Sequence, residues 1–167
     1  MSLTSGILID TLFGPKLVET LCTGDPVLTA EGSIQMLDTV VRATFAPERL
    51  GRSRHKPVLI RRNAFGRGNP SRDMLVSPGQ KVNVAGYLPR NAASLIDDWR
   101  IVVARPRTPL TFIELRFSCP CNVVANGTPV AAKSGPAAPK RLTRKTRPAL
   151  SGPSVAALPL FNRPVTR

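Results

Sequence analysis

The side chains best suited to binding a soft metal ion in this chain are those of its three cysteines and its single histidine. Cys119 and Cys121 flank Pro120, whereas Cys22 and His55 lie far away in the sequence. A zinc site of four such ligands normally contains a pair of cysteines separated by two to four residues, and one residue separates them here. Free cysteine is also commonly just a small buried side chain. We therefore predict no metal site and no cofactor.

A cluster of cations near the C-terminus is the second chemically distinctive stretch. Five basic residues fall within eight positions: Lys140, Arg141, Arg144, Lys145 and Arg147. Such a run attracts phosphate groups through counterion release, without reading nucleotide sequence. It is equally suited to anionic lipid head groups or an acidic protein surface, and a solvated tail that only improves solubility has the same composition. No aromatic residue follows until Phe161, which argues against stacking on bases.

The charge of the chain is divided unevenly along its length. The 167 residues carry a formal net charge of +14, and all ten acidic residues lie at or before Glu114. The last 35 positions hold eight basic residues and no acid. Residues 133–167 also lack apolar periodicity, and such a segment buries too little surface to offset the entropy of ordering. We expect one domain over residues 1–132 and a disordered basic tail over residues 133–167.

The composition also bears on membrane insertion, secretion, disulfide bonding and the fold class. The chain has no apolar run of about 18 residues, so we predict no transmembrane helix. The first residues lack the basic and apolar regions of a secretory signal, which leaves the localisation unknown, with a cytoplasmic default. An odd number of cysteines argues against a disulfide framework. The chain contains 17 prolines and 12 glycines, which favours short strands over long helices.

The chain is organised around residues 72–84, in which two apolar runs flank Ser77-Pro78-Gly79. Valine-rich runs interrupted by Pro-Gly predict two strands that meet at a tight turn. Proline presets the backbone angle that the turn needs, and glycine can adopt a positive φ. Gln80 opens the second strand, where a side chain is held in place firmly enough to take part in chemistry.

The remaining sequence predicts further short strands. A Gly-containing loop at residues 30–33 joins residues 27–29 to 34–41 as a β-hairpin, and Asn126-Gly127 marks another. Residues 13–16 are expected to form a turn, residues 44–56 an exposed connection, and residues 91–96 a short helix capped by Asn91. The other strands are expected at residues 6–9, 17–21, 57–60, 101–103, 110–117 and 122–125. The prediction is an all-β domain of hairpins.

Several of these segments also resemble a known family. They are Gly6-Ile7-Leu8-Ile9, residues 18–32 with Gly24-Asp25-Pro26-Val27-Leu28-Thr29, residues 57–66, Pro70-Ser71-Arg72-Asp73-Met74-Leu75-Val76-Ser77-Pro78, and Val123-Val124-Ala125-Asn126-Gly127. Their order and gaps resemble those of a bacterial Hint domain, the hedgehog/intein type of self-processing domain. The resemblance covers about residues 2–132 and implies a compact, pseudo-twofold horseshoe of β-hairpins.

The resemblance also implies a chemistry, and this chain departs from it. In active members a cysteine at the first position of the domain attacks the preceding carbonyl, and a histidine protonates the leaving amine. The nucleophile position falls on Ser2, which only Met1 precedes here, and the histidine position falls on Gln80. A further histidine that the family often has falls near Pro120. A serine can still form an ester, but a glutamine amide does not donate a proton near pH 7.

We therefore expect a degenerate Hint domain that keeps the fold, has lost autoprocessing and acts as a binding or structural module with an unknown protein partner. Two alternatives stay open. One is residual self-processing through Ser2, by an N–O acyl shift. The other is binding of nucleic acid or an anionic surface through the basic tail.

Overall fold

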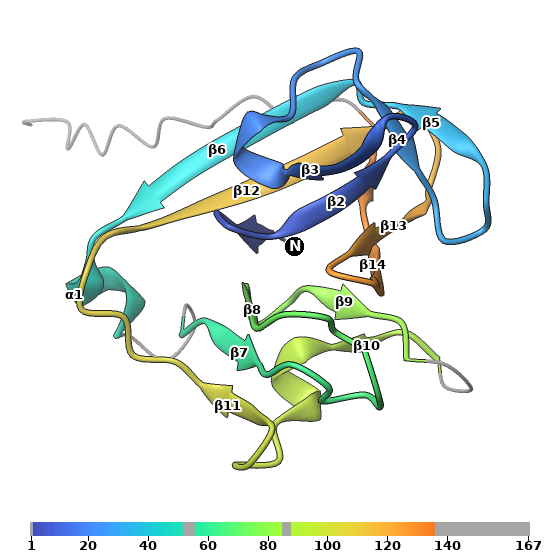
Figure 1. Cartoon of the computed structure of the whole chain (residues 1–167). Coiled ribbons are helices and arrows are strands. Elements are labelled where there is room, and N and C mark those ends of the chain that lie inside the picture. The colour runs from blue at the N-terminus through green and yellow to red at the C-terminus, as the bar shows by residue number, and fades with distance from the viewer. Residues whose placement is uncertain (1, 52–55, 85–87, 136–167) are drawn as a thin grey trace, which may run out of the picture.

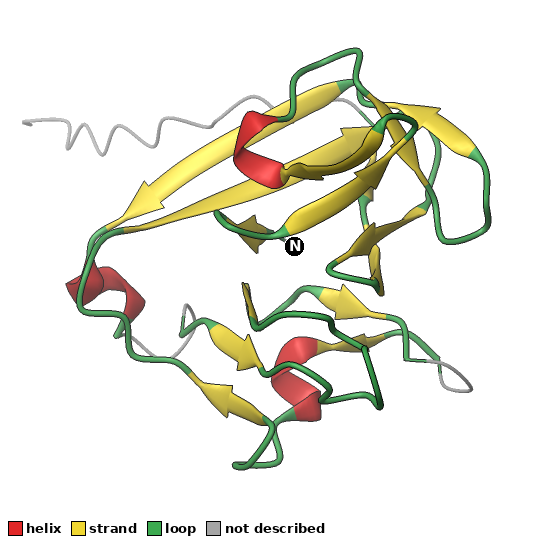
Figure 2. Cartoon of the chain, in the orientation of Figure 1, coloured by secondary structure: helices red, strands yellow, loops and turns green. Residues whose placement is uncertain are grey.

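Strands dominate the computed structural model, which describes residues 2–51, 56–84 and 88–135 (Figure 2). Its helical segments are the single turn α1 (Pro47–Leu50) and two 3₁₀ turns, η1 (Val18–Thr20) and η2 (Ala92–Leu95). The predicted all-β class is confirmed. None of the helices in the described part of the chain is long and apolar enough to cross a membrane.

The first sheet is built around β12, an eight-residue strand. Its strands are β1 (Leu3–Thr4), β6 (Thr39–Phe45), β7 (Val58–Ile60), β8 (Met74–Val76), β11 (Ile101–Val103), β12 (Leu110–Phe117) and β15 (Lys133–Ser134). They are ordered β11-β7-β8-β1-β12-β15, and β6 also pairs with β12. The short strand β1 lies between β8 and β12, with Leu3 opposite both Val76 and Ile113.

The second sheet contains the hairpins that the sequence predicts. Its strands are β2 (Leu8–Thr11), β3 (Gly14–Leu17), β4 (Pro26–Leu28), β5 (Ile34–Met36), β9 (Lys81–Val82), β10 (Arg90–Asn91), β13 (Asn122–Ala125) and β14 (Thr128–Ala131). They follow the order β10-β9-β14-β13-β2-β4-β5, and β3 pairs with β2. Asn126 and Gly127 join β13 to β14 with φ of 48° and 80°, the positive values that a two-residue hairpin turn requires.

Both sheets contribute to one hydrophobic core. Ile9, Val27 and Val123 of the second sheet belong to the same buried cluster as Met74 and Ile113 of the first. Figure 1 shows the long strands β6 and β12 on one side of the molecule and β7, β8 and β11 on the other. The short strand β1, which directly follows Ser2, pairs with β12 of the first group and with β8 of the second and so joins the two groups.

The turn at residues 77–79 exists, but it does not close a hairpin. Its two flanking strands, β8 and β9, belong to different sheets. The chain therefore crosses from one sheet to the other at this turn, and Gln80 is the residue immediately before β9. Gly79 is also absent from the residues with positive φ. The local pattern indicated a turn correctly, whereas strand partners depend on segments far away in sequence.

Residues 44–51 are mostly exposed, as expected, but they are not an irregular connection. β6 extends to Phe45, and α1 buries Leu50 to 1% exposure. Residues 52–55, which include His55, lie outside the described residues. The run at residues 34–41 is also divided between β5 and β6, because the chain leaves one sheet for the other at Leu37 and Asp38.

Four smaller expectations also differ from the structure. Of the strand expected at residues 17–21, Val18–Thr20 form the 3₁₀ turn η1. The turn predicted at residues 13–16 is shorter, since β3 starts at Gly14. The helix predicted at residues 91–96 is the 3₁₀ turn η2, and the Asn91 side chain makes no capping hydrogen bond. Lys133 and Ser134 were expected in the tail but form β15, parallel to β12. The rest of the predicted tail, residues 136–167, lies outside the described residues.

Candidate functional site

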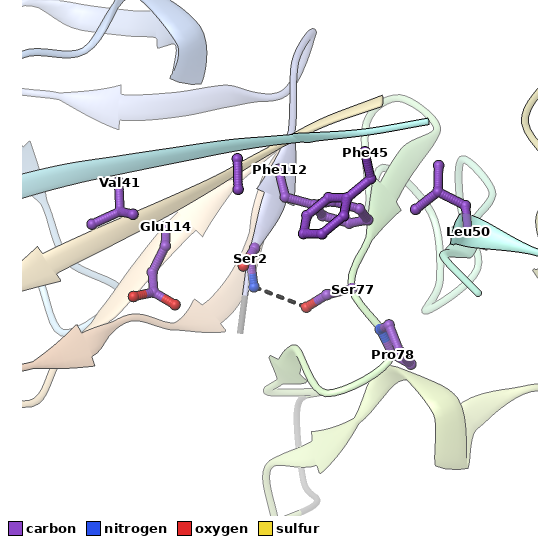
Figure 3. A pocket seen from close by; sticks show the side chains of 9 residues that line it. Ser2, Val41, Phe45, Leu50, Ser77, Pro78, Phe112 and Glu114 are labelled. Atoms are coloured by element: carbon purple, nitrogen blue, oxygen red, sulfur yellow. Dashed lines mark hydrogen bonds between the residues drawn. The ribbon is translucent and has the colours of Figure 1, made fainter. Parts of the chain in front are cut away.

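Ser2 is held by its backbone against the turn that follows β8. Its amide nitrogen donates a hydrogen bond of 2.9 Å to Oγ of Ser77 (Figure 3). The amide nitrogen of Ser77 in turn donates to the carbonyl oxygen of Ser2, also at 2.9 Å. These two bonds extend the pairing of β1 with β8 by one residue. The position where the resemblance places a nucleophile therefore has a fixed backbone.

Gln80 is buried, with 2% of its surface exposed. Its side-chain nitrogen Nε2 donates to the carbonyl oxygen of Ala131 at 2.8 Å and to that of Lys81 at 3.1 Å. Its backbone nitrogen donates to Ser77, and its carbonyl oxygen accepts from Ala92. A primary amide has two N–H donors, and both are used here. The side chain is thus fixed between the crossing turn and the last hairpin.

The structure brings the two predicted site positions together. Ser2 and Gln80 line one small cavity of about 10 Å³, together with Ala131 and Lys133. We call it the Gln80 cavity. A volume of this size accommodates at most one water molecule. No substrate group larger than water enters between Ser2 and Gln80 unless the neighbouring side chains move.

A larger pocket of about 210 Å³ lies next to Ser2. We call it the Phe45 pocket. Its polar or charged lining residues are Ser2, Ser77 and Glu114, and its apolar ones are Val41, Ala43, Phe45, Leu50, Pro78 and Phe112 (Figure 3). The rings of Phe45 and Phe112 meet edge to face with centroids 5.8 Å apart, a favourable aromatic geometry. The pocket can therefore accept an apolar group beside the first residue of the domain.

Glu114 is an acidic residue of the site that the sequence reasoning did not select. It lies on β12, and its carboxylate binds Arg116 at 2.5 Å and Lys133 at 2.7 Å. Residues two apart on a strand point to the same face, so the Glu-x-Arg spacing was a signal for the first pair. The second pair was not visible, because Lys133 was assigned to the tail. Through it, the charges beside Ser2 are coupled to β15.

The ionisable groups that line the two cavities are Glu114 and Lys133. These two side chains are already joined to each other by an ion pair of 2.7 Å. The ammonium of Lys133 can still donate hydrogen bonds. Within the described residues, the site offers a hydroxyl, an amide and an ion pair.

The three cysteines that we considered as possible metal ligands do not form a metal centre in the part of the chain that the structure describes. No group of three or more His, Cys, Asp and Glu residues within those ranges is arranged to hold a metal ion. Cys22 and Cys119 are exposed, whereas Cys121 is half-buried. Burial raises the pKa of the Cys121 thiol to about 11, and Glu31 and Cys119 add to the rise.

The five cations proposed to bind polyanions, from Lys140 to Arg147, lie outside the described residues. The carboxylate pair Asp97 and Asp98 is exposed. Asp97 accepts hydrogen bonds from the backbone nitrogens of Trp99, Arg100 and Ile101. These bonds, chiefly the one from Ile101, lower the pKa of Asp97. This carboxylate orders a surface turn.

Comparison with solved structures defines the class of fold. The bacterial intein-like domain from Clostridium thermocellum matches with a TM-score of 0.58 and 9% identity, over 79% of this chain and 98% of that one. The gp41-1 intein matches with a TM-score of 0.53 and 14% identity, over 79% of this chain and 98% of the intein. The MchDnaB-1 intein matches with a TM-score of 0.50 and 12% identity, over 78% of this chain and 99% of the intein. At these identities the similarity establishes an intein-like fold and nothing more.

The sequence itself matches the Hint domain family over residues 1–132. The chain belongs to the Hint domain family, and the resemblance inferred from its motifs is confirmed. No curated protein gives a significant match to the sequence.

Proposed function

We propose that this chain is a degenerate Hint domain that has lost autoprocessing and acts as a binding or structural module. Self-processing in the family, as the resemblance implies, combines a nucleophile at the first residue with an acid for the leaving nitrogen. Ser2 and Gln80 occupy these two positions. The structure supports the proposal through what each side chain is able to do there.

The hydrogen bonding of Gln80 is the observation that carries the proposal. An amide does not release a proton near neutral pH, so it is no general acid. Both of its N–H groups are also already donated, to Ala131 and Lys81, and neither is available to a leaving amine. Loss of a general acid costs about 10²–10⁴-fold in rate.

The environment of Ser2 supports the same conclusion. A hydroxyl becomes a good nucleophile only when a base takes its proton. The carboxylate of Glu114, which lines the pocket beside Ser2, binds two cations, Arg116 and Lys133. Both oxygens of this carboxylate are therefore already engaged by a cation. Binding is the role that the apolar Phe45 pocket favours, because pockets with an apolar lining and few polar groups are typical of ligand sites.

A fusion experiment tests the loss of autoprocessing. A reporter domain is placed directly ahead of Ser2, and the intact mass is followed with and without a thiol or hydroxylamine. We expect the fusion to keep its full mass. Release of the reporter, abolished by Ser2→Ala, would show that the chemistry persists. Ser5→Ala is the matched control, since it removes an exposed hydroxyl close in the sequence but not the candidate nucleophile or its hydrogen-bond partner Ser77.

Residual self-processing through Ser2 is the second candidate, and one observation favours it. Lys133 lines the Gln80 cavity together with Ser2, and an ammonium near a reacting carbonyl stabilises the negative charge that develops during attack. In the same fusion, Lys133→Met would then slow release of the reporter. If the fusion does not release the reporter at all, the ammonium has only a structural role in the ion pair with Glu114.

A further inference from the structure

The Phe45 pocket is an apolar cavity for which the described chain provides no occupant. Its volume of about 210 Å³ exceeds the ~150 Å³ at which an apolar protein cavity binds benzene. One aromatic ring therefore fits, with room for part of a neighbouring side chain. Arg49 already lies over the Phe45 ring at 5.9 Å, and the Phe112 ring, which meets Phe45 edge to face, also lines the pocket, so its wall is aromatic.

The sequence outside the described residues contains a matching segment. Residues 155–161 read Val-Ala-Ala-Leu-Pro-Leu-Phe, an uncharged apolar run within an otherwise basic tail. Phe161 is the only aromatic residue after position 135. Exposing the apolar side chains of such a run to water is unfavourable. A short peptide with a few apolar side chains is a common ligand of a hydrophobic groove or pocket.

The geometry of β15 and β12 allows this segment to reach the pocket. Gly135 is fixed by a hydrogen bond of 3.0 Å from its nitrogen to the carbonyl oxygen of Phe117. Phe117 and Phe112 are five residues apart on β12, which corresponds to about 17 Å at the usual rise per residue. A random coil as long as residues 136–154 has a typical end-to-end distance of roughly 22–26 Å. A connection of this length therefore spans the distance without being stretched.

The wall of the Phe45 pocket distinguishes it from the other large apolar one. A pocket of about 340 Å³ is lined by Phe65, Val84, Leu88, Leu95 and Ile101 together with Arg90. The Phe45 pocket is lined by two aromatic rings, and its single charged lining residue, Glu114, already pairs with Arg116 and Lys133. A docked aromatic ring therefore meets two rings in the Phe45 pocket, and one ring beside a guanidinium in the other.

We propose that residues 155–161 of the same chain dock in the Phe45 pocket, with Phe161 as the anchor. Any other ligand of the pocket has to displace this segment. This proposal does not depend on whether Ser2 is reactive.

Methyl NMR of the full chain tests the proposal. Leucine and valine methyl groups are labelled, and the wild type is compared with Phe161→Ala. Removing a docked ring shifts the methyl resonances of Val41 and Leu50 in the Phe45 pocket, while those of Val84 and Leu95 stay unchanged. The matched control is Leu150→Ala, a tail substitution outside the apolar segment, which leaves all four residues unaffected. Both substitutions lie after β15, the last strand that the structure describes.

Three outcomes would overturn the proposal. One is the absence of any shift at Val41 and Leu50, which would mean that the pocket is open to another ligand. The second is a shift confined to Val84 and Leu95, which would place the segment in the other pocket. The third is a shift that disappears on dilution, which would indicate that the tail of a second copy is the occupant. None of these readouts measures cleavage, so they leave the fusion experiment at Ser2 unaffected.

Discussion

Nε2 of Gln80 lies 2.8 Å from the carbonyl oxygen of Ala131, and this hydrogen bond joins the turn after β8 to the last hairpin of the second sheet. The same nitrogen donates to Lys81, and the side chain is almost completely buried. The position at which the family resemblance places an acid is therefore a structural connection in this chain. Removing this side chain should therefore lower the free energy of unfolding of the domain.

Gln80→Ala should destabilise the domain by about 1–3 kcal/mol, because the carbonyl oxygens of Ala131 and Lys81 lose a buried donor. Urea denaturation of the full chain measures the change in the free energy of unfolding. Gln35→Ala on β5 is the matched control, since Gln35 is only partly buried on a strand at the edge of its sheet. Its effect should stay within about 0.5 kcal/mol. Equal effects of the two substitutions would contradict the structural role of Gln80.

Alkylation should distinguish Cys121 from the two exposed cysteines. The pKa of its thiol is raised to about 11, so the thiolate fraction at pH 8 is on the order of 10⁻³. We expect iodoacetamide to modify Cys121 last in the folded chain, as followed by peptide mass mapping. Its rate should rise about tenfold for each pH unit between 8 and 10. In urea the difference should disappear, and a fast reaction of Cys121 in the folded chain would refute the assignment.

The same thiol has a consequence for stability. The pKa of Cys121 is higher in the folded chain than its ordinary value of 9.0, so the unfolded chain binds fewer protons in the window from about 9 to about 11. Stability therefore falls as the pH rises through this window. Cys121→Ser should flatten that part of the pH profile, whereas Cys22→Ser should not. A profile identical to that of the wild type would contradict the prediction.

The strands themselves were predictable where local sequence determines them. The alternation of β12 and the turn residues Asn126 and Gly127 require particular backbone conformations whatever the rest of the chain does. The family motifs supplied the rest of the architecture. By contrast, the sheet to which a strand belongs depends on non-local pairing, so the local pattern of residues 72–84 predicted two strands and a turn but not that β8 and β9 belong to different sheets.

The site was predictable in its two positions but not in its surroundings. The motif spacing identified Ser2 and Gln80, and they do line one cavity. Neither the pocket beside Ser2 nor the pairing of Glu114 with Lys133 could be predicted. Leu50 and Lys133 lay in segments that were read as exposed or disordered from their charge and proline content. Their burial or pairing comes from contacts with residues far away in the sequence.

Polyanion binding by the basic tail should be weak and strongly dependent on salt. Replacing the five cations from Lys140 to Arg147 by glutamine should reduce the slope of log affinity against log salt concentration. Heparin or single-stranded DNA titrated between about 50 and 200 mM salt measures the slope. If the variant and the wild type bind equally, the basic surface belongs to the β domain, and Arg49, Arg61 and Arg62 are the residues to replace next.

The last prediction concerns whether the scaffold can still support chemistry. Ser2→Cys provides a thiol that is a better nucleophile than a hydroxyl, and Gln80→His provides an acid that titrates near neutral pH. Both positions line the Gln80 cavity, and the backbone of residue 2 is fixed by Ser77, so the new groups are held close together. We expect the double variant, with a reporter fused ahead of residue 2, to release that reporter in the presence of thiol. Either single variant should release it at least about 10²-fold more slowly, because nucleophile and acid act in the same step.

A double variant that folds, as judged by its urea transition, but releases no reporter would show that the carbonyl before residue 2 is not presented to the nucleophile. In that case the loss of activity extends to the geometry of the site and is not limited to its two substituted residues.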